Sequence, residues 1–131
     1  MEICLYMPVV EGFAAALEGV VGEVVPRGDL TVLRAFPELR AAMGSFFEKG
    51  CVFILHAPDS ASLETILTIK DRVLQHKIIL ITADNLPATI SSGHLLRPRL
   101  QVSEGEEALE IIPAVLQKMM KRGKAVSHVE N

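Results

Sequence analysis

The chain has 131 residues, of which 50% are hydrophobic and 22% are charged, and its formal net charge is −3. This length fits a single domain with a real core, and the hydrophobic content excludes an intrinsically disordered chain. The acidic charge balance argues against a nucleic-acid partner, because phosphate binding needs a concentrated basic face. The basic residues that do cluster lie at 118–124, where they complement the negative end of a final helix.

Neither a targeting segment nor a membrane span is predicted. Glu2 stands where a secretory signal peptide would carry Lys or Arg, and no apolar run approaches the roughly 18 residues of a membrane span. We therefore expect a soluble, cytoplasmic protein. Cys4 and Cys51 each lie inside a predicted strand and match no zinc-ligand spacing, so we interpret them as small buried hydrophobes rather than as a disulfide or metal framework. No glycine-rich nucleotide motif occurs, and we expect neither a metal nor a cofactor.

In the first part of the chain, short apolar runs alternate with amphipathic segments. Residues 2–7 predict a strand, and residues 9–21 have apolar side chains at helical spacing up to Gly22. A second strand is predicted at 30–36, where β-branched residues are frequent. Residues 37–50 then predict a helix with one apolar stripe, formed by Leu39, Met43, Phe46 and Phe47.

The middle of the chain contains two strands that are apolar at almost every position. Residues 51–57 form the first, and residues 77–84 the second. Because both faces of such a strand must be covered, we expect these strands at the centre of a sheet. Asp59 or Ser60 can cap the helix between them, whose buried side is marked by Leu63, Ile66, Leu67, Val73 and Leu74.

The last part of the chain predicts a short helix within 85–93 and then an edge strand at 97–102, where Pro98 suits an edge. Ser103 and Glu106 have the spacing of a capping box for the last helix. Pro113 lies inside that helix and predicts a kink or a division into two short helices. We expect one domain over 1–122, followed by a frayed tail at 123–131. Five strands alternating with five helices predict a parallel sheet covered on both faces, an α/β fold.

Three segments are similar to a known family. The run IILITAD at 78–84 resembles the fourth strand of the receiver domain of bacterial response regulators, and EEALEIIPAVL at 106–116 resembles its last helix. VFILHAPDS at 52–60, followed by LETILTIK at 63–70, resembles the third strand, its loop and the third helix. The resemblance covers nearly the whole chain in pattern and spacing. It implies a flavodoxin-like three-layer sandwich with a five-stranded parallel sheet of order 2-1-3-4-5.

The resemblance also implies which chemistry the chain lacks. The family phosphorylates an aspartate at the end of the third strand, using Mg²⁺ held by that carboxylate and by an acidic pair after the first strand. Here His56 takes the aspartate's place, Tyr6 and Met7 stand at the acidic pair, and Gln101 stands at the family's lysine. Only Thr82 matches. The resemblance therefore implies a pseudo-receiver, without catalytic residues and without aspartyl phosphorylation.

Other interpretations of these residues stay open. His56 at a strand end could carry a phosphoryl group as a phosphocarrier, or it could be a polar cap on a buried strand. His56, Asp59, Thr82 and Asp84 could line a crevice that senses a small ligand, although helix and turn capping also explain the two aspartates. The serine-bearing helix start after residue 57 is similar to that of anti-sigma-antagonist domains, but the Asp-Ser-Ser-Gly signature of that family is not present.

The resemblance further implies how such a domain would act. Receiver domains use the fourth helix, the fifth strand and the last helix to bind partners and to dimerise, and this surface corresponds to about 87–122 here. We therefore expect a protein partner, such as a signalling kinase or regulator, or a second copy of this chain.

Overall fold

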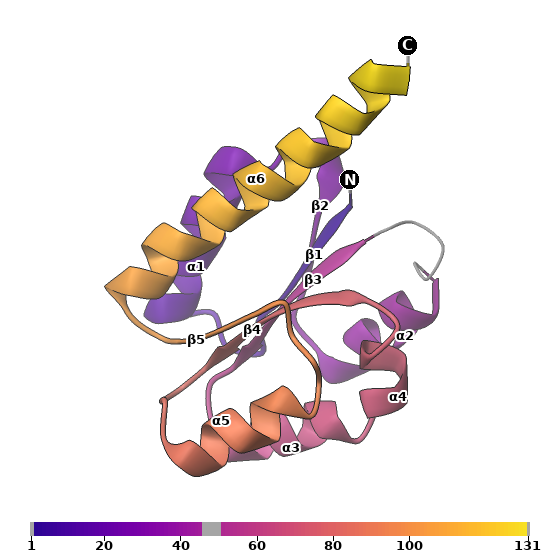
Figure 1. Ribbon diagram of the computed structural model, residues 1–131. Helices are drawn as coiled ribbons and strands as arrows, with labels where there is room; N and C mark the ends of the chain where they lie inside the picture. Colours follow the sequence, from indigo (N-terminus) through magenta and orange to yellow (C-terminus); the bar gives the residue numbers. More distant parts are fainter. Residues whose placement is uncertain (1, 46–50, 131) are drawn as a thin grey trace.

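The structure is a computed structural model that describes residues 2–45 and 51–130. Side chains are described for residues 2–44 and 51–121. The centre of the structure is a parallel sheet in the order β2-β1-β3-β4-β5 (Figure 1). This order confirms the predicted flavodoxin-like α/β fold. The strands are β1 Ile3–Tyr6, β2 Leu30–Leu33, β3 Val52–Ala57, β4 Lys77–Thr82 and β5 Leu100–Ser103.

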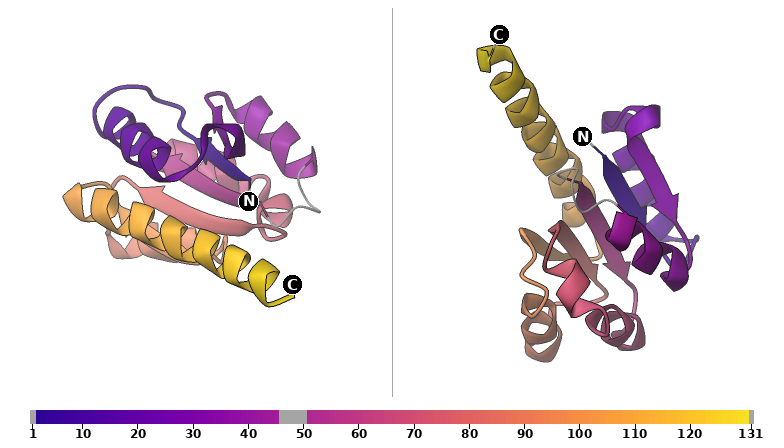
Figure 2. Two further views of the ribbon diagram at one scale, coloured as in Figure 1. Left: turned by 90° about the horizontal axis from the view of Figure 1, so that it is seen from above. Right: turned by 90° about the vertical axis from the view of Figure 1, so that its right-hand side faces the viewer.

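Helices cover both faces of the sheet and complete a three-layer sandwich (Figures 1 and 2). One face carries α1 Phe13–Val24 and α6 Glu106–Glu130, which pack side by side. A single turn of 3₁₀ helix, Arg27–Asp29, leads into β2. The other face carries α2 Phe36–Ser45, α3 Ser60–Leu67, α4 Lys70–Val73 and α5 Pro87–His94.

The central strands supply most of the core, as their saturated sequences predict. All six residues of β3 are buried, and five of the six in β4 are buried as well. Successive side chains of a strand point to opposite faces of the sheet, so each strand contributes to two separate clusters. Phe53 and Leu55 pack on the face covered by α2 to α5, whereas Val52 and Ile54 pack on the face covered by α1 and α6. β5 lies at the edge of the sheet and is only partly buried, as predicted.

The helix expected after β3 is interrupted. The chain forms α3 up to Leu67 and α4 from Lys70, and the turn between them is closed by tighter bonds to the carbonyl three residues back, from Thr68 to Thr65 and from Ile69 to Ile66. The prediction of one continuous helix is therefore wrong. The change of direction buries Val73 fully but leaves Leu74 37% exposed, so Leu74 is not part of the buried side.

Two other helix ends differ from the prediction. α1 continues past Gly22 to Val24, because Gly22 adopts helical backbone angles and the helix stops only before Pro26. α2 begins at Phe36, where the carboxylate of Glu38 accepts hydrogen bonds from the preceding backbone N–H groups of Arg34 and Ala35. Leu39 and Met43 are buried as predicted. The remainder of the predicted stripe, Phe46 and Phe47, lies outside the described residues.

The last helix is one continuous helix that contains Pro113, and it is not divided into two. Ala108, Ile112 and Leu116 are all buried on the sheet at four-residue spacing on both sides of the proline, which explains why the loss of one backbone bond is tolerated. Ser103 belongs to β5 and so does not cap α6. Instead the chain turns at Gly105, whose φ of 147° favours glycine, and the first helical bond runs from Leu109 N to Gly105 O.

α6 also extends through 123–130, the segment predicted as a tail, and its last turns project beyond the rest of the molecule (Figures 1 and 2). Fraying of these residues stays a prediction. Among the described helices, none combines the length and the apolar character that a membrane span requires.

Asp59 caps α3 as the sequence predicts. Its Oδ1 accepts a hydrogen bond of 2.7 Å from the backbone N–H of Ser62. This bond and a weaker one from the Ser62 side chain lower the pKa of the Asp59 carboxyl below its ordinary value of 3.8. A carboxylate at this position also interacts favourably with the positive end of the helix.

We expect Asp59→Ala to lower the free energy of unfolding by about 1 kcal/mol at neutral pH, the usual cost of losing a cap. Because the folded-state pKa of Asp59 is lowered, its ionic contribution is fully present above the ordinary pKa and is lost as the pH falls through the folded-state pKa. Urea unfolding at several pH values measures this effect. Asp59→Asn is the matched control, since it keeps a capping oxygen but should lose the pH-dependent part. Equal pH dependence in the wild type and Asp59→Asn would contradict the assignment.

Candidate functional site

The carboxyl ends of the strands hold the residues for which the sequence suggested a function. At the end of β1, Tyr6 and Met7 are 4% and 0% exposed. Tyr6 packs in the cluster beneath α2 to α5, and Met7 packs in the cluster beneath α1 and α6. Burial raises the pKa of the Tyr6 hydroxyl, which keeps it neutral. These two positions are therefore part of the core, where the resemblance would have placed two metal-binding carboxylates.

His56 is buried in the second-last position of β3, with 1% of its surface exposed. Strand alternation places its side chain on the α1 and α6 face, two residues after Ile54. The imidazole lies against the ring of Phe13 in α1, with the ring centroids 5.4 Å apart. Its Nε2 is 2.8 Å from Oε2 of Glu104, whereas Nδ1 is buried without a hydrogen-bond partner in the described part of the chain.

Glu104 is the functional-site residue that the sequence interpretation missed. It follows β5, and its backbone N–H donates to Thr82 O at 2.8 Å, which extends the pairing of β4 with β5 by one residue. Its side chain shares the face of Val102, is 28% exposed and reaches across β4 to His56. The signal available in the sequence was an acidic residue directly after the fifth strand, at the edge where the ends of parallel strands meet.

Thr82 points to the opposite face of the sheet from His56. It ends β4, where it is paired with Ala57 of β3 and with Ser103 of β5. Its hydroxyl is buried and donates to the carbonyl of Asp84 at 2.8 Å. The sheet thus separates Thr82 from His56, and the structure does not bring the two side chains into one crevice.

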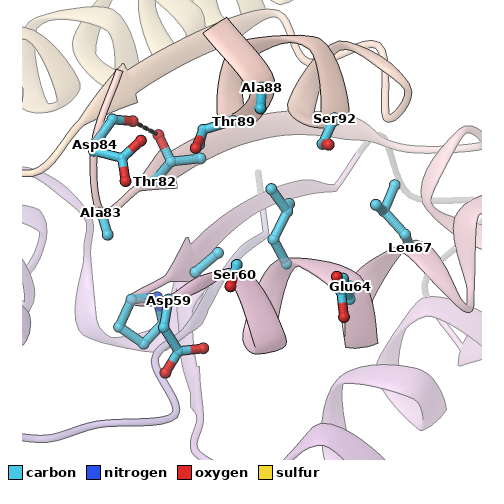
Figure 3. A pocket seen from close by; sticks show the side chains of 13 residues that line it. Asp59, Ser60, Glu64, Leu67, Thr82, Ala83, Asp84, Ala88, Thr89 and Ser92 are labelled. Carbon is cyan, nitrogen blue, oxygen red and sulfur yellow. Dashed lines mark hydrogen bonds between the residues drawn. The ribbon is translucent and has the colours of Figure 1, made fainter. Parts of the chain in front are cut away.

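Thr82, Asp59 and Asp84 do come together. They line a groove of about 470 Å³ between α3 and α5 (Figure 3). His56 does not line this groove. The other polar side chains around it, on α3 and α5, are Ser60, Glu64, Thr89 and Ser92.

The groove is negatively charged at neutral pH. The hydrogen bond from the Thr89 side chain, and a second from the backbone N–H of Leu86, lower the pKa of the Asp84 carboxyl. Asp59 on the other wall is held ionised by its cap to α3. Both aspartates therefore have the capping role that the sequence also suggested, and both remain exposed to solvent at the mouth of the groove.

Gln101 lies away from this end of the sheet. The register pairs it with Leu80, two residues before the pair of Thr82 and Ser103. Its Nε2 donates a long hydrogen bond of 3.5 Å to the carbonyl of Ile90 in α5. A Cβ atom on Gly93 would overlap the Gln101 amide, so the glycine allows α5 to approach β5 closely. Gln101 is thus a packing residue between β5 and α5 in this structure.

No protein-family model matches the chain, and comparisons with curated proteins and with solved structures find no significant match. Within residues 2–44 and 51–121, no group of three or more His, Cys, Asp or Glu side chains is arranged to hold a metal ion. The chemistry that the described end of the sheet offers is therefore a buried imidazole–carboxylate pair on one face and an acidic, hydroxyl-lined groove on the other.

Proposed function

We propose that this chain is a non-catalytic, receiver-like domain that acts through protein contacts in bacterial signal transduction or regulation, in the cytoplasm. The observation that carries the proposal is that the side chain of His56, near the end of β3, is shielded from solvent. By the sequence resemblance, His56 corresponds to the family's phosphoacceptor, and it is 1% exposed and contacts Glu104 and Phe13. A phosphoryl donor has no direct access to such a side chain, whereas the fold around it is intact.

The surface formed by α5, β5 and α6 is the candidate partner surface. Six large hydrophobic side chains are exposed in the described part of the chain, and three of them, Leu86, Ile90 and Leu95, lie on α5 or at its ends. The neighbouring β5 lies at the edge of the sheet, and among the described strands it pairs only with β4. Exposed apolar groups beside an open strand edge are typical of interaction surfaces. A signalling kinase or regulator, or a second copy of this chain, would bind there.

A photo-crosslinking amino acid tests this surface in living cells of the native host. Leu86 and Val10 are both 59% exposed, but Val10 lies in the loop between β1 and α1. We expect a discrete crosslinked protein when the crosslinker replaces Leu86 and none when it replaces Val10. Adding Ile90→Glu should abolish the Leu86 crosslink, because a charge in an apolar contact must lose its hydration. Equal crosslinking at both positions, or none at Leu86, would count against the surface.

A phosphorylation assay tests the loss of the switch. We expect acetyl phosphate with Mg²⁺ to leave the intact mass of the purified chain unchanged. A gain of about 80 Da, the mass of one phosphoryl group, that disappears in Asp59→Asn would overturn the proposal. The same sample analysed at alkaline pH tests the alternative in which His56 carries phosphate, because phosphohistidine is labile in acid.

The groove between α3 and α5 favours a second candidate function, sensing of a small ligand. Its volume of about 470 Å³ lies within the range of small-molecule sites, and hydroxyls and carboxylates line it together. A thermal-shift screen of small amines and polar metabolites tests this candidate. A compound that raises the midpoint of thermal unfolding of the wild type, but not that of Ser92→Leu, would support this function, because Ser92 lines the groove.

A further inference from the structure

The two cysteines of the chain meet at the end of the sheet opposite to the groove. Cys4 lies in β1 and Cys51 directly precedes β3, and both side chains belong to the cluster beneath α2 to α5. β1 and β3 are parallel neighbours in the sheet, which brings together residues that are 47 positions apart. The two Sγ atoms are 3.7 Å apart, and both residues are free thiols with 0% and 2% exposure.

The contact makes the two thiols chemically different. The hydrogen bond between the two sulfurs raises the pKa of Cys4, with burial adding to the effect. The same bond lowers the pKa of Cys51, against the opposing effect of burial. Cys51 is therefore the thiol that more readily becomes a thiolate, the nucleophilic form of cysteine. Cys4 stays protonated beside it in the reduced protein and gives up its proton only when it attacks, because a resolving cysteine also reacts through its thiolate.

We propose that Cys4 and Cys51 form a reversible intramolecular disulfide when a small hydroperoxide oxidises the protein. The Cys51 thiolate attacks one oxygen of the peroxide, the O–O bond breaks, and the released hydroxide takes a proton to become water. The sulfur of Cys4 then attacks the resulting sulfenic acid, the S–O bond breaks, and a second water leaves with the proton of Cys4. Two thiols thus lose two electrons to one peroxide, and a dithiol can return the pair to the reduced form.

Burial selects the oxidant. Because neither cysteine residue is more than 2% exposed, hydrogen peroxide can reach the pair through a small local opening, whereas a bulky disulfide cannot. The product would tie β1 to the entry of β3. In the unfolded chain it would also close a long loop, which is the situation in which a disulfide stabilises most.

The experiment treats the reduced full-length chain with hydrogen peroxide and measures intact mass and thermal unfolding. We expect a loss of about 2 Da and a linked peptide that contains both cysteines in a non-reducing digest. The midpoint of thermal unfolding should rise by roughly 10 °C and return after treatment with a dithiol. A bulky aromatic disulfide should react with the folded chain at least about tenfold more slowly than with the unfolded chain.

Two variants separate the roles of the cysteines. In Cys4→Ser the resolving thiol is absent, so Cys51 should gain about 16 or 32 Da and the thermal midpoint should not rise. In Cys51→Ser the remaining Cys4 should stay unmodified at the same peroxide concentration. Peptide mapping separates these changes from oxidation of the five methionines. A wild-type chain that keeps two free thiols, or that forms only disulfide-linked dimers, would overturn the proposal and leave the proposed partner surface unaffected.

Discussion

His56→Asp should lower the free energy of unfolding by about 3–5 kcal/mol and should not create a phosphorylation site. The substitution introduces the residue type that the proposed resemblance to receiver domains would have at this position, but His56 is 1% exposed and its Nε2 is 2.8 Å from Oε2 of Glu104. An ionised aspartate there would be desolvated and would repel Glu104. It would also lose the ring contact with Phe13.

Chemical unfolding at neutral pH measures the loss of unfolding free energy. The intact mass after incubation with acetyl phosphate and Mg²⁺ shows whether a phosphoryl group is added. His56→Asn is the matched control, because its neutral amide is also small but can donate a hydrogen bond to Glu104. It should cost clearly less than His56→Asp. If His56→Asp unfolds with the same free energy as the wild type, or if it becomes phosphorylated, then this end of β3 is open to solvent. Either result would contradict the burial of position 56.

The second large effect concerns the partner of His56. Glu104→Ala should lower the free energy of unfolding by about 1–3 kcal/mol, because it leaves the buried imidazole of His56 with no hydrogen-bond partner at either ring nitrogen. The cost should nearly vanish when His56 is already Leu, since Glu104 is 28% exposed and water can solvate it. The difference between the two values is the coupling energy of the pair, measured by a double-mutant cycle in urea.

Glu110→Ala serves as the control for removing an acidic side chain from this region, because Glu110 is exposed on α6. Its effect should stay within about 0.5 kcal/mol. A Glu104→Ala cost that is the same with His56 and with Leu at position 56 would show that the 2.8 Å contact contributes nothing. If the coupling is found, it links β3 at the centre of the sheet to the connection between β5 and α6, two elements of the proposed partner surface.

The amino-acid sequence determined the features of this protein that depend on neighbouring residues. The unbroken apolar runs of β3 and β4 require cover on both faces, and this requirement alone places them at the centre of a parallel sheet. Asp59 caps α3 through a residue three positions away, so its role was also readable in advance. The polar and proline-containing segment before Leu100 predicted an edge strand for the same local reason.

Tertiary structure decided whatever depends on register and on contacts distant in sequence. His56 and Thr82 each end a strand, but only the pairing of Ala57 with Thr82 shows that they face opposite sides of the sheet. Glu104 lies 48 positions from His56, and the two cysteines are 47 positions apart, so neither pair leaves a local pattern. A shift of one residue in the pairing of a strand would move each of its side chains to the opposite face of the sheet. The correct register is set by the packing of the whole core.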